Sequence, residues 1–277
     1  MRLLEVLTRT RFQVLTFPKG TVATGGNPTG GGSGFILLHK GKSIFVTADH
    51  VCHPNDYEHK ITKRSFDDKD VAIVNNYTMK DRDGVEMPIL TPIGGFYYFD
   101  KFNFTADKGF DDFTPYDATF AIMGADRFQT PFLSEPLYVA NGEDVPGGLE
   151  MIQIPSGNIV TPNSTDCYIV YGHTRLRWAA DNVHLAWDIN HHEDMVYVRE
   201  EGDYYVLRPN EPIVNEQWSG ISGSPVLNQE GGLLGILCSG RPDLKEIYVM
   251  KMQSVLSLID TTLKIEEIER QKNTDKQ

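Results

Sequence analysis

Residues 35–51 read FILLHKGKSIFVTADHV and contain two short apolar runs, Phe35–Leu38 and Ile44–Val46, on either side of HKGKS. Two runs of strand length separated by a few polar residues are typical of a β-hairpin, and Gly41 can adopt the positive φ that the turn requires. More apolar runs of four to six residues, divided by Gly, Pro, Asn and Asp, follow along the chain. The sequence therefore predicts a fold built from short antiparallel strands.

Helical periodicity is clear only at the C-terminus, where Val255, Ile259 and Leu263 recur every four residues. The tail after Glu269 has no apolar residue and is expected to fray. Residues 23–34, rich in glycine, are interpreted as a loop. The remaining expected strands are Phe12–Phe17, Val71–Val74, Phe96–Tyr98, Phe120–Met123, Met151–Ile154, Tyr168–Tyr171, Met195–Val198, Tyr204–Leu207, Pro225–Leu227, Leu233–Leu237 and Ile247–Met250.

The composition limits the class of protein. Of 277 residues, 40% are hydrophobic and 23% charged, which is ordinary for a chain that buries a core and excludes a disordered one. The net charge of −12 disfavours binding to nucleic acids or to anionic membranes, because both attract cations. No 18-residue apolar stretch and no convincing signal peptide are present, and three cysteines make no disulfide framework. We therefore expect a cytoplasmic protein.

The strongest local motif is GISGSPV, Gly220–Val226. Glycines on both sides of Ser222 allow a tight turn that exposes the hydroxyl and aims neighbouring amide groups at one point. A nucleophilic serine needs this arrangement, since an oxyanion develops beside it. A polar turn before a strand would explain the motif almost as well.

A second motif, TADHV, ends the apolar run around Phe45. A lone histidine is usually a structural or surface residue. His50, however, lies where a strand breaks off, as a positioned general base does.

Taken together, GSGFILL, SIFVTADHV and GISGSPV resemble the motifs of the trypsin-like (chymotrypsin-fold) serine peptidases, closest in style to the disulfide-free bacterial branch that includes the HtrA-type proteases. The resemblance covers roughly residues 12–265. It implies an all-β fold of two antiparallel six-stranded β-barrels with a C-terminal helix, divided into lobes at residues 1–130 and 131–277. Residues 124–148, which are rich in Pro and Gly, are the candidate boundary. The resemblance also implies that His50 is the base, that Ser222 is the nucleophile, and that the Gly220 and Ser222 amides form the oxyanion hole.

Two aspartates fit the acid of the triad. Asp70 has the cleaner local pattern, DVAIV, but follows His50 by only 20 residues. Asp117 follows it by 67 residues, which leaves room for the remaining strands of a first barrel at roughly 8–12 residues per strand and turn. We therefore expect Asp117 to be the acid and Asp70 to begin an internal strand.

The substrate pocket is less readable. The resemblance implies that Ser239 and Gly240 border it, and that Glu216, six residues before Ser222, lies at its floor and favours a basic substrate residue; a surface position for Glu216 fits equally well. Ile221 replaces the aspartate that pairs with a newly cut N-terminus in digestive relatives, so the site is either preformed or assembled by a partner or a ligand. The pair His191 and His192 is interpreted as a polar turn rather than a metal site.

These observations predict a serine endopeptidase that needs no metal or organic cofactor and acts on a protein or peptide. One alternative is an inert protease fold that serves as a binding module. The other is a selective peptidase switched on by an activating partner protein.

Overall fold

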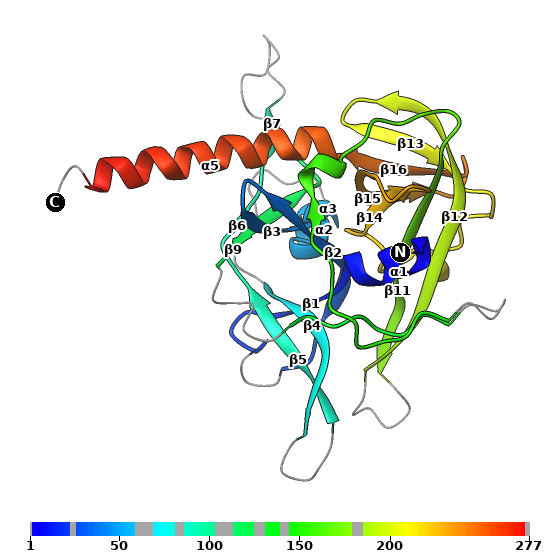
Figure 1. Ribbon diagram of the computed structural model, residues 1–277, viewed down its shortest axis with the longest axis horizontal. Coiled ribbons are helices and arrows are strands. Elements are labelled where there is room, and N and C mark those ends of the chain that lie inside the picture. Colours follow the sequence, from blue (N-terminus) through cyan, green and yellow to red (C-terminus); the bar gives the residue numbers. More distant parts are fainter. Residues whose placement is uncertain are drawn as a thin grey trace.

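The computed structural model consists mainly of β-strands, with a helix near each end and short helical turns between (Figure 1). It describes residues 2–22, 26–58, 69–80, 86–102, 113–124, 131–138, 144–178 and 185–274. The strands gather into an eight-stranded sheet and a closed six-stranded barrel, which lie side by side in Figure 1. The predicted mostly-β class and the C-terminal helix are therefore confirmed. Within the described part of the chain, no helix has the length and apolar character needed to cross a membrane.

Seven strands of the eight-stranded sheet come from the first half of the chain and have the order β5-β4-β1-β2-β3-β9-β6. The eighth, β10, comes from the second half and pairs in parallel with β2. β7 and β8, which lie between β6 and β9 in the sequence, form a separate antiparallel pair. The strands are β1 (Arg11–Pro18), β2 (Gly30–His39), β3 (Lys42–Thr47), β4 (Lys69–Lys80), β5 (Glu86–Ile93), β6 (Phe96–Tyr97), β7 (Asp100–Phe102), β8 (Phe113–Pro115), β9 (Thr119–Met123) and β10 (Ile154–Pro155).

The barrel comes from the second half and closes in the order β11-β12-β13-β16-β15-β14. Its strands are β11 (Cys167–Trp178), β12 (Leu185–Glu201), β13 (Tyr204–Arg208), β14 (Pro225–Asn228), β15 (Leu233–Arg241) and β16 (Glu246–Lys251). The helices are α1 (Leu3–Thr10), α2 (Asp49–Cys52), α3 (Asn55–Glu58), the 3-10 turn η3 (Ser156–Asn158), α4 (Asn215–Trp218) and α5 (Met252–Thr274).

The hairpin predicted from residues 35–51 is present as β2 and β3. Its register pairs His39 with Lys42, so Lys40 and Gly41 form a two-residue turn, and both have positive φ, 50° and 73°. This geometry is that of the mirror-image turns whose twist matches antiparallel strands. The local pattern was sufficient because the turn and both strands are contiguous in sequence.

The glycine-rich segment was only partly a loop. Residues 23–25 lie outside the described residues, but Gly30–Gly34 belong to β2 and pair with β1. The packing explains why a strand carries so many glycines: a Cβ on Gly34 would lie 2.5 Å from the ring of Phe45. The prediction of a loop over this part was wrong, because these glycines allow neighbouring groups to pack closely against the strand and do not form a turn.

Three other expectations change. Met151–Ile154 is not a strand, since only Ile154 and Pro155 pair, in parallel with β2. The C-terminal tail continues as helix to Thr274 instead of fraying after Glu269. The helix α1 was not predicted, because eight residues give too little periodicity; packing of the buried Leu7 against the core holds it in place.

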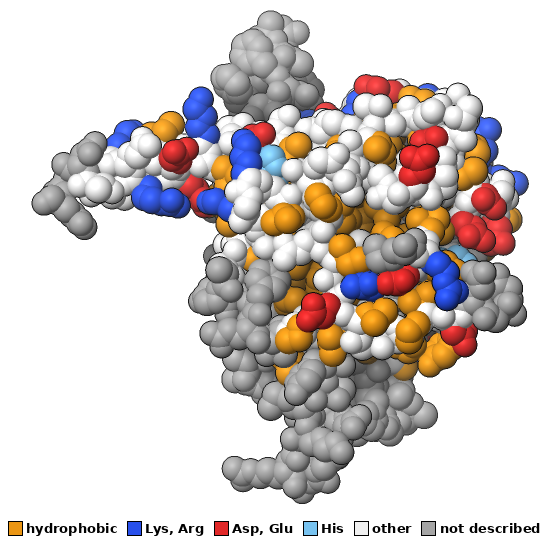
Figure 2. All heavy atoms as spheres, viewed as in Figure 1, with side chains coloured by type: hydrophobic (Ala, Val, Ile, Leu, Met, Phe, Trp, Pro, Cys, Tyr) orange, Lys and Arg blue, Asp and Glu red, His pale blue; other side chains and the backbone are white. Residues whose placement is uncertain are grey.

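The helix α5 has two different halves. Its first half is anchored by four side chains, Met252, Val255, Ile259 and Thr262, which are buried. Beyond them the helix leaves the body of the molecule, and Figure 2 shows both basic and acidic side chains along this projecting part. The anchored half packs against β15 and β16, and its buried apolar side chains belong to the same core cluster as those of the sheet.

Candidate active site

The GISGSP turn lies between the two β units. The turn follows α4 in the sequence. On one side β15 holds its backbone, because the Gly223 amide donates to the Leu237 carbonyl at 2.8 Å. On the other side the Ser33 amide of β2 donates to the Ser222 carbonyl, also at 2.8 Å. Ser222 is therefore fixed from both units at once.

Both glycines of the turn are required by its shape. Gly220 and Gly223 have φ of +103° and +89°, which side-chain-bearing residues rarely adopt. A Cβ on Gly220 would lie 2.5 Å from the His173 carbonyl oxygen, and one on Gly223 would lie 1.9 Å from the Ser33 carbonyl oxygen. Between them Ile221 is fully buried in the barrel core, so apolar packing anchors the turn from below.

His50 is placed by α2, the helical turn that follows β3. Its Nδ1 lies 2.9 Å from Oδ1 and 3.0 Å from Oδ2 of Asp117, and its backbone amide donates to Oδ1 at 3.1 Å. Asp117 lies two residues before the start of β9, the neighbour of β3 in the sheet. The pairing of β3 with β9 thus brings together two residues that are 67 positions apart.

The contact between His50 and Asp117 shifts the pKa of both side chains. Burial works to lower the pKa of His50, but the charge of Asp117 and its hydrogen bond outweigh burial and raise the pKa above 6.5. Burial works to raise the pKa of Asp117, and the His50 contacts hold that pKa below its ordinary value. Asp117 is thus an anion that favours the protonated imidazole.

Asp70 lies elsewhere. It is the second residue of β4, and its carboxylate accepts a hydrogen bond from the Gly20 amide at 2.7 Å. Of the two candidate acids, only Asp117 contacts His50. Asp70 begins a strand inside the sheet, as its apolar sequence pattern indicates.

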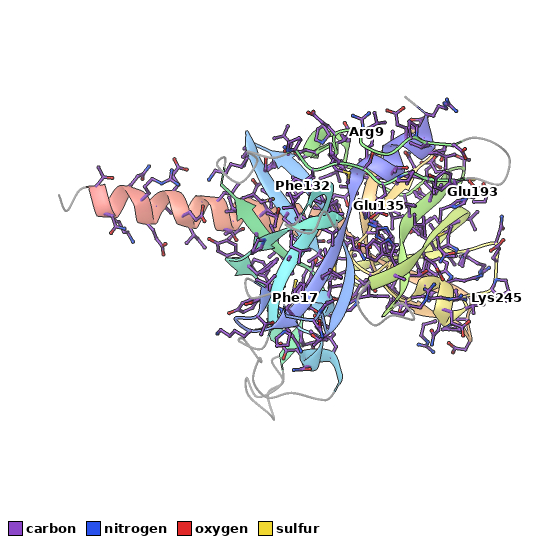
Figure 3. The ribbon with its side chains drawn as sticks, turned by 90° about the horizontal axis from the view of Figure 1, so that it is seen from below. Arg9, Phe17, Phe132, Glu135, Glu193 and Lys245 are labelled. Atoms are coloured by element: carbon purple, nitrogen blue, oxygen red, sulfur yellow. The ribbon has the colours of Figure 1, made fainter. Side chains whose placement is uncertain are left out.

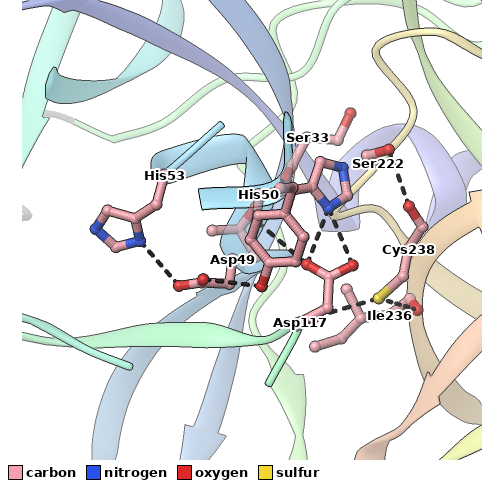
Figure 4. A network of polar contacts seen from close by, with 10 residues as sticks. Ser33, Asp49, His50, His53, Asp117, Ser222, Ile236 and Cys238 are labelled. Atoms are coloured by element: carbon pink, nitrogen blue, oxygen red, sulfur yellow. Dashed lines mark hydrogen bonds and ion pairs between the residues drawn. The ribbon is translucent and has the colours of Figure 1, made fainter. Parts of the chain in front are cut away.

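No hydrogen bond joins the hydroxyl of Ser222 to His50 in this structure. Its Oγ donates to the Cys238 carbonyl at 3.4 Å, while the second ring nitrogen of His50 lies on the side of the imidazole that faces Ser222 (Figure 4). Catalytic hydrogen bonds are often long or misaligned before substrate binds. Rotation about the Cα–Cβ bond of Ser222 is the movement that would turn its hydroxyl toward the imidazole.

The Gly220 and Ser222 amides have no hydrogen-bond acceptor among the described residues. The Gly220 carbonyl accepts a bond from Ser33 Oγ at 3.0 Å, which fixes the plane of the following peptide. Two unoccupied amides next to a serine hydroxyl are the donors that an oxyanion requires.

No protein-family model matches this chain, and no curated protein matches it either. The interpretation of the site therefore depends on its geometry and on the motifs themselves.

The expected pocket residues are less well supported. Ser239 and Gly240 are exposed at the end of β15. Glu216 is also exposed, with 70% of its side chain accessible, and its carboxylate lies 3.8 Å from Arg175. Glu216 therefore occupies the surface position that the sequence left open, rather than a pocket floor.

Three residues of the site were missed from the sequence. Cys238 Sγ donates to the Asp117 carbonyl at 3.2 Å, and Ser33 holds the turn as described. Asp49 is fully buried and accepts bonds from His53 Nδ1 and Tyr57 Oη, both at 2.9 Å. The adjacency of Asp49 to His50 was the one available signal; Ser33 and Cys238 act through contacts that only the fold creates.

The described residues contain no group of three or more His, Cys, Asp and Glu side chains that could hold a metal ion. His192 stacks on the Trp218 ring with centroids 3.8 Å apart and hydrogen-bonds to the Gln217 carbonyl at 3.1 Å. His191 and His192 lie inside strand β12, so the interpretation of this pair as a polar turn is wrong.

Proposed function

We propose that this protein is a serine endopeptidase of the trypsin-like type, with Ser222 as nucleophile, His50 as base and Asp117 as the acid that orients it. The observation that carries the proposal is the contact of His50 with Asp117 beside a doubly anchored Ser222 turn. Residues of the three types that acyl transfer needs come from three distant parts of the chain and lie near one another there (Figure 4).

The fold is consistent with this proposal. In the arrangement we infer, the sheet of the first half corresponds to one barrel, residues 1–130, and the closed barrel belongs to the other lobe, residues 131–277. The catalytic groups would then lie in the cleft between the two, as in other peptidases of this type.

The chemistry follows from the geometry. His50 accepts the proton of Ser222 Oγ while the oxygen bonds to the carbonyl carbon of the substrate. Asp117 stabilises the imidazolium, and the Gly220 and Ser222 amides bind the oxyanion. His50 then gives the proton to the leaving amine as the C–N bond breaks. Water, activated in the same way, releases the acyl group from Ser222.

One observation favours an alternative, a fold that binds without cleaving or awaits an activating partner. The hydroxyl of Ser222 is bonded to Cys238 rather than to His50. Against it, His50 is hydrogen-bonded to Asp117 and both glycines of the turn have positive φ. The buried Ile221 also offers no carboxylate with which a cut N-terminus could pair.

Treatment with a fluorophosphonate followed by intact-mass measurement tests the proposal. We expect one adduct on the wild type and none on Ser222→Ala. Asp117→Asn should slow labelling by about 10⁴, because the imidazole loses its orienting anion, whereas Asp70→Asn should label at the wild-type rate. A folded wild type that stays unlabelled would support the binding-module alternative, and labelling only in cell lysate would indicate a required partner.

A further inference from the structure

A cavity adjoins the Ser222 turn, with a volume of about 380 Å³. The glycine tract Gly30–Gly32 of β2 forms one wall, and residues 174–177 of β11 form the other. Ser219 and Gly220 also line the cavity, so it reaches the residue that carries one of the two proposed oxyanion donors. A substrate bound at Ser222 would therefore reach into it.

The position of the cavity identifies the part of the substrate that it can hold. The turn lies between β15, which we expect to pair with the acyl side of the substrate, and β2. No residue of β15 lines the cavity, whereas three residues of β2 do. These glycines also lie before the point where β2 begins to pair with β3, at Gly34. The chain that leaves Ser222 on the amine side would thus run along a glycine wall without β3 in its way.

The charges lining the cavity are of one sign. Arg175 and Arg177 line it together with His173, whose pKa is lowered by burial and by Arg11 to about 4, so that the imidazole is neutral at pH 7. None of the described lining residues is acidic. In a chain of net charge −12, a cavity lined by two guanidinium groups is a local exception.

The two arginines are held at the rim by acids outside the cavity. Asp188 lies 3.5 Å from Arg175 and 3.0 Å from Arg177, and Glu216 lies 3.8 Å from Arg175. Both arginine side chains remain about half exposed, with 48% and 52% accessible. Arg177 Nη1 also donates to the Arg175 carbonyl at 3.0 Å. Each guanidinium has five N–H donors, so both side chains keep donors for a further carboxylate.

The backbone at Arg175 is unusual. The register between β11 and β12 shifts between Thr174 and Arg177, and Arg175 has a φ of 52°. Such bulges re-aim side chains and are frequent next to active sites. Here the bulge directs Leu176 toward the glycine wall, 3.3 Å from where a Cβ on Gly31 would be. Arg175, next to it, lies at the rim beside Asp188 and Glu216.

We propose that this cavity binds an acidic side chain of the substrate on the amine side of the cleaved bond, with Arg175 and Arg177 as its specificity determinants. The proposal rests on the proposed peptidase activity. A carboxylate can accept paired hydrogen bonds from a guanidinium group, which an uncharged amide of the same shape matches poorly.

Acyl transfer tests this preference without knowledge of the natural substrate. The wild type is acylated with p-nitrophenyl acetate, and Gly-Asp-NH₂ or Gly-Asn-NH₂ then competes with water for the acetyl group; Asp-Gly-NH₂ and Asn-Gly-NH₂ probe the adjacent position. Attack by the peptide amine forms a C–N bond, breaks the bond to Ser222 Oγ and returns a proton to that oxygen through His50.

We expect the acidic peptide of at least one pair to be acetylated about tenfold more efficiently than its amide. The double variant Arg175→Gln and Arg177→Gln should bring the pair to parity. Arg199→Gln is the matched control, because Arg199 is a surface arginine that is paired with Glu246 away from the cavity. Equal transfer to both peptides of each pair by an acylated wild type would overturn the proposal.

A binding measurement separates this proposal from the peptidase itself. If the wild type gives no Ser222-dependent burst of p-nitrophenol, the proposed function fails. The cavity can still be tested on Ser222→Ala by titrating the arginine Nε signals with millimolar Gly-Asp-NH₂. Saturable shifts of Arg175 and Arg177, absent with Gly-Asn-NH₂, would support a carboxylate site, and their absence would reject it.

Discussion

In the proposed mechanism, His50 would determine the pH at which Ser222 reacts, because only the neutral imidazole accepts a proton. Its pKa is raised above 6.5, since Asp117 outweighs the effect of burial. We therefore expect the rate of fluorophosphonate labelling to rise with pH through a midpoint above 6.5. In Asp117→Asn the raising charge is lost while burial remains, so the midpoint should move to lower pH as the maximal rate falls.

The rate of labelling measured from pH 5 to pH 9 checks this expectation. Asp70→Asn provides the control, because Asp70 bonds to Gly20 and should leave the midpoint where it is. An unchanged midpoint in Asp117→Asn would mean that another group governs the reaction.

The residues of the site differ in how far the sequence could identify them. His50 and Ser222 carry motifs whose meaning is local. Asp117 could be preferred to Asp70 only by counting the strands that must separate it from the histidine. Cys238 and Ser33 could not be identified, because a thiol near a carbonyl and a hydroxyl near a turn have no signature until strands from different units meet.

At the scale of elements, two glycine turns make a matched pair for a stability measurement. Gly223 and Gly41 both have positive φ, 89° and 73°. A Cβ on Gly223 would lie 1.9 Å from the Ser33 carbonyl oxygen, whereas a Cβ on Gly41 would meet no atom within 4 Å. Gly41→Ala should therefore cost only the backbone strain, about 1–2 kcal/mol.

Gly223→Ala should cost more, at least about 3 kcal/mol of unfolding free energy, because β2 and the turn must move apart. It should also abolish labelling of Ser222, which Gly41→Ala should preserve. Denaturant unfolding of both variants checks the difference. Equal costs would indicate that the turn is not clamped between the two units.

The elements themselves were predictable wherever sequence neighbours also become spatial neighbours. The hairpin of β2 and β3 is such a case, and so is the anchored half of α5. The glycine tract was wrongly predicted as a loop. Its glycines pair with β1, and Gly34 leaves room for the ring of Phe45, which composition cannot show. The helix α1 was missed because its stability comes from the core and not from its own eight residues.

At the scale of the whole molecule, the two β units are joined by a buried polar network. Arg11 of β1 donates to Nδ1 of His173 in β11, and Nε2 of His173 donates to Glu135, which precedes the barrel in sequence. Figure 3 shows Glu135 between the sheet and the barrel. Such a seam could not be predicted, because its members are separated by up to 162 residues and each looks like an ordinary surface residue in the sequence.

The network requires a neutral His173, since Nδ1 must accept from a cation. Burial and Arg11 lower the pKa of His173 to about 4, against about 6.5 in an unfolded chain. A depressed pKa contributes stability that is complete above pH 6.5 and is lost as the pH falls toward 4. For one group this amounts to at most about 3 kcal/mol.

His173→Gln should remove this pH dependence while keeping the contacts, because the amide can accept from Arg11 and donate to Glu135. We expect the wild type to lose more unfolding free energy between pH 7.5 and pH 4.5 than the variant does. The difference between the two losses, measured by denaturant unfolding, isolates His173 from the other groups that titrate in this range, including Glu135. Equal losses would mean that His173 titrates normally in the folded protein and that the two units are not joined through its neutral imidazole.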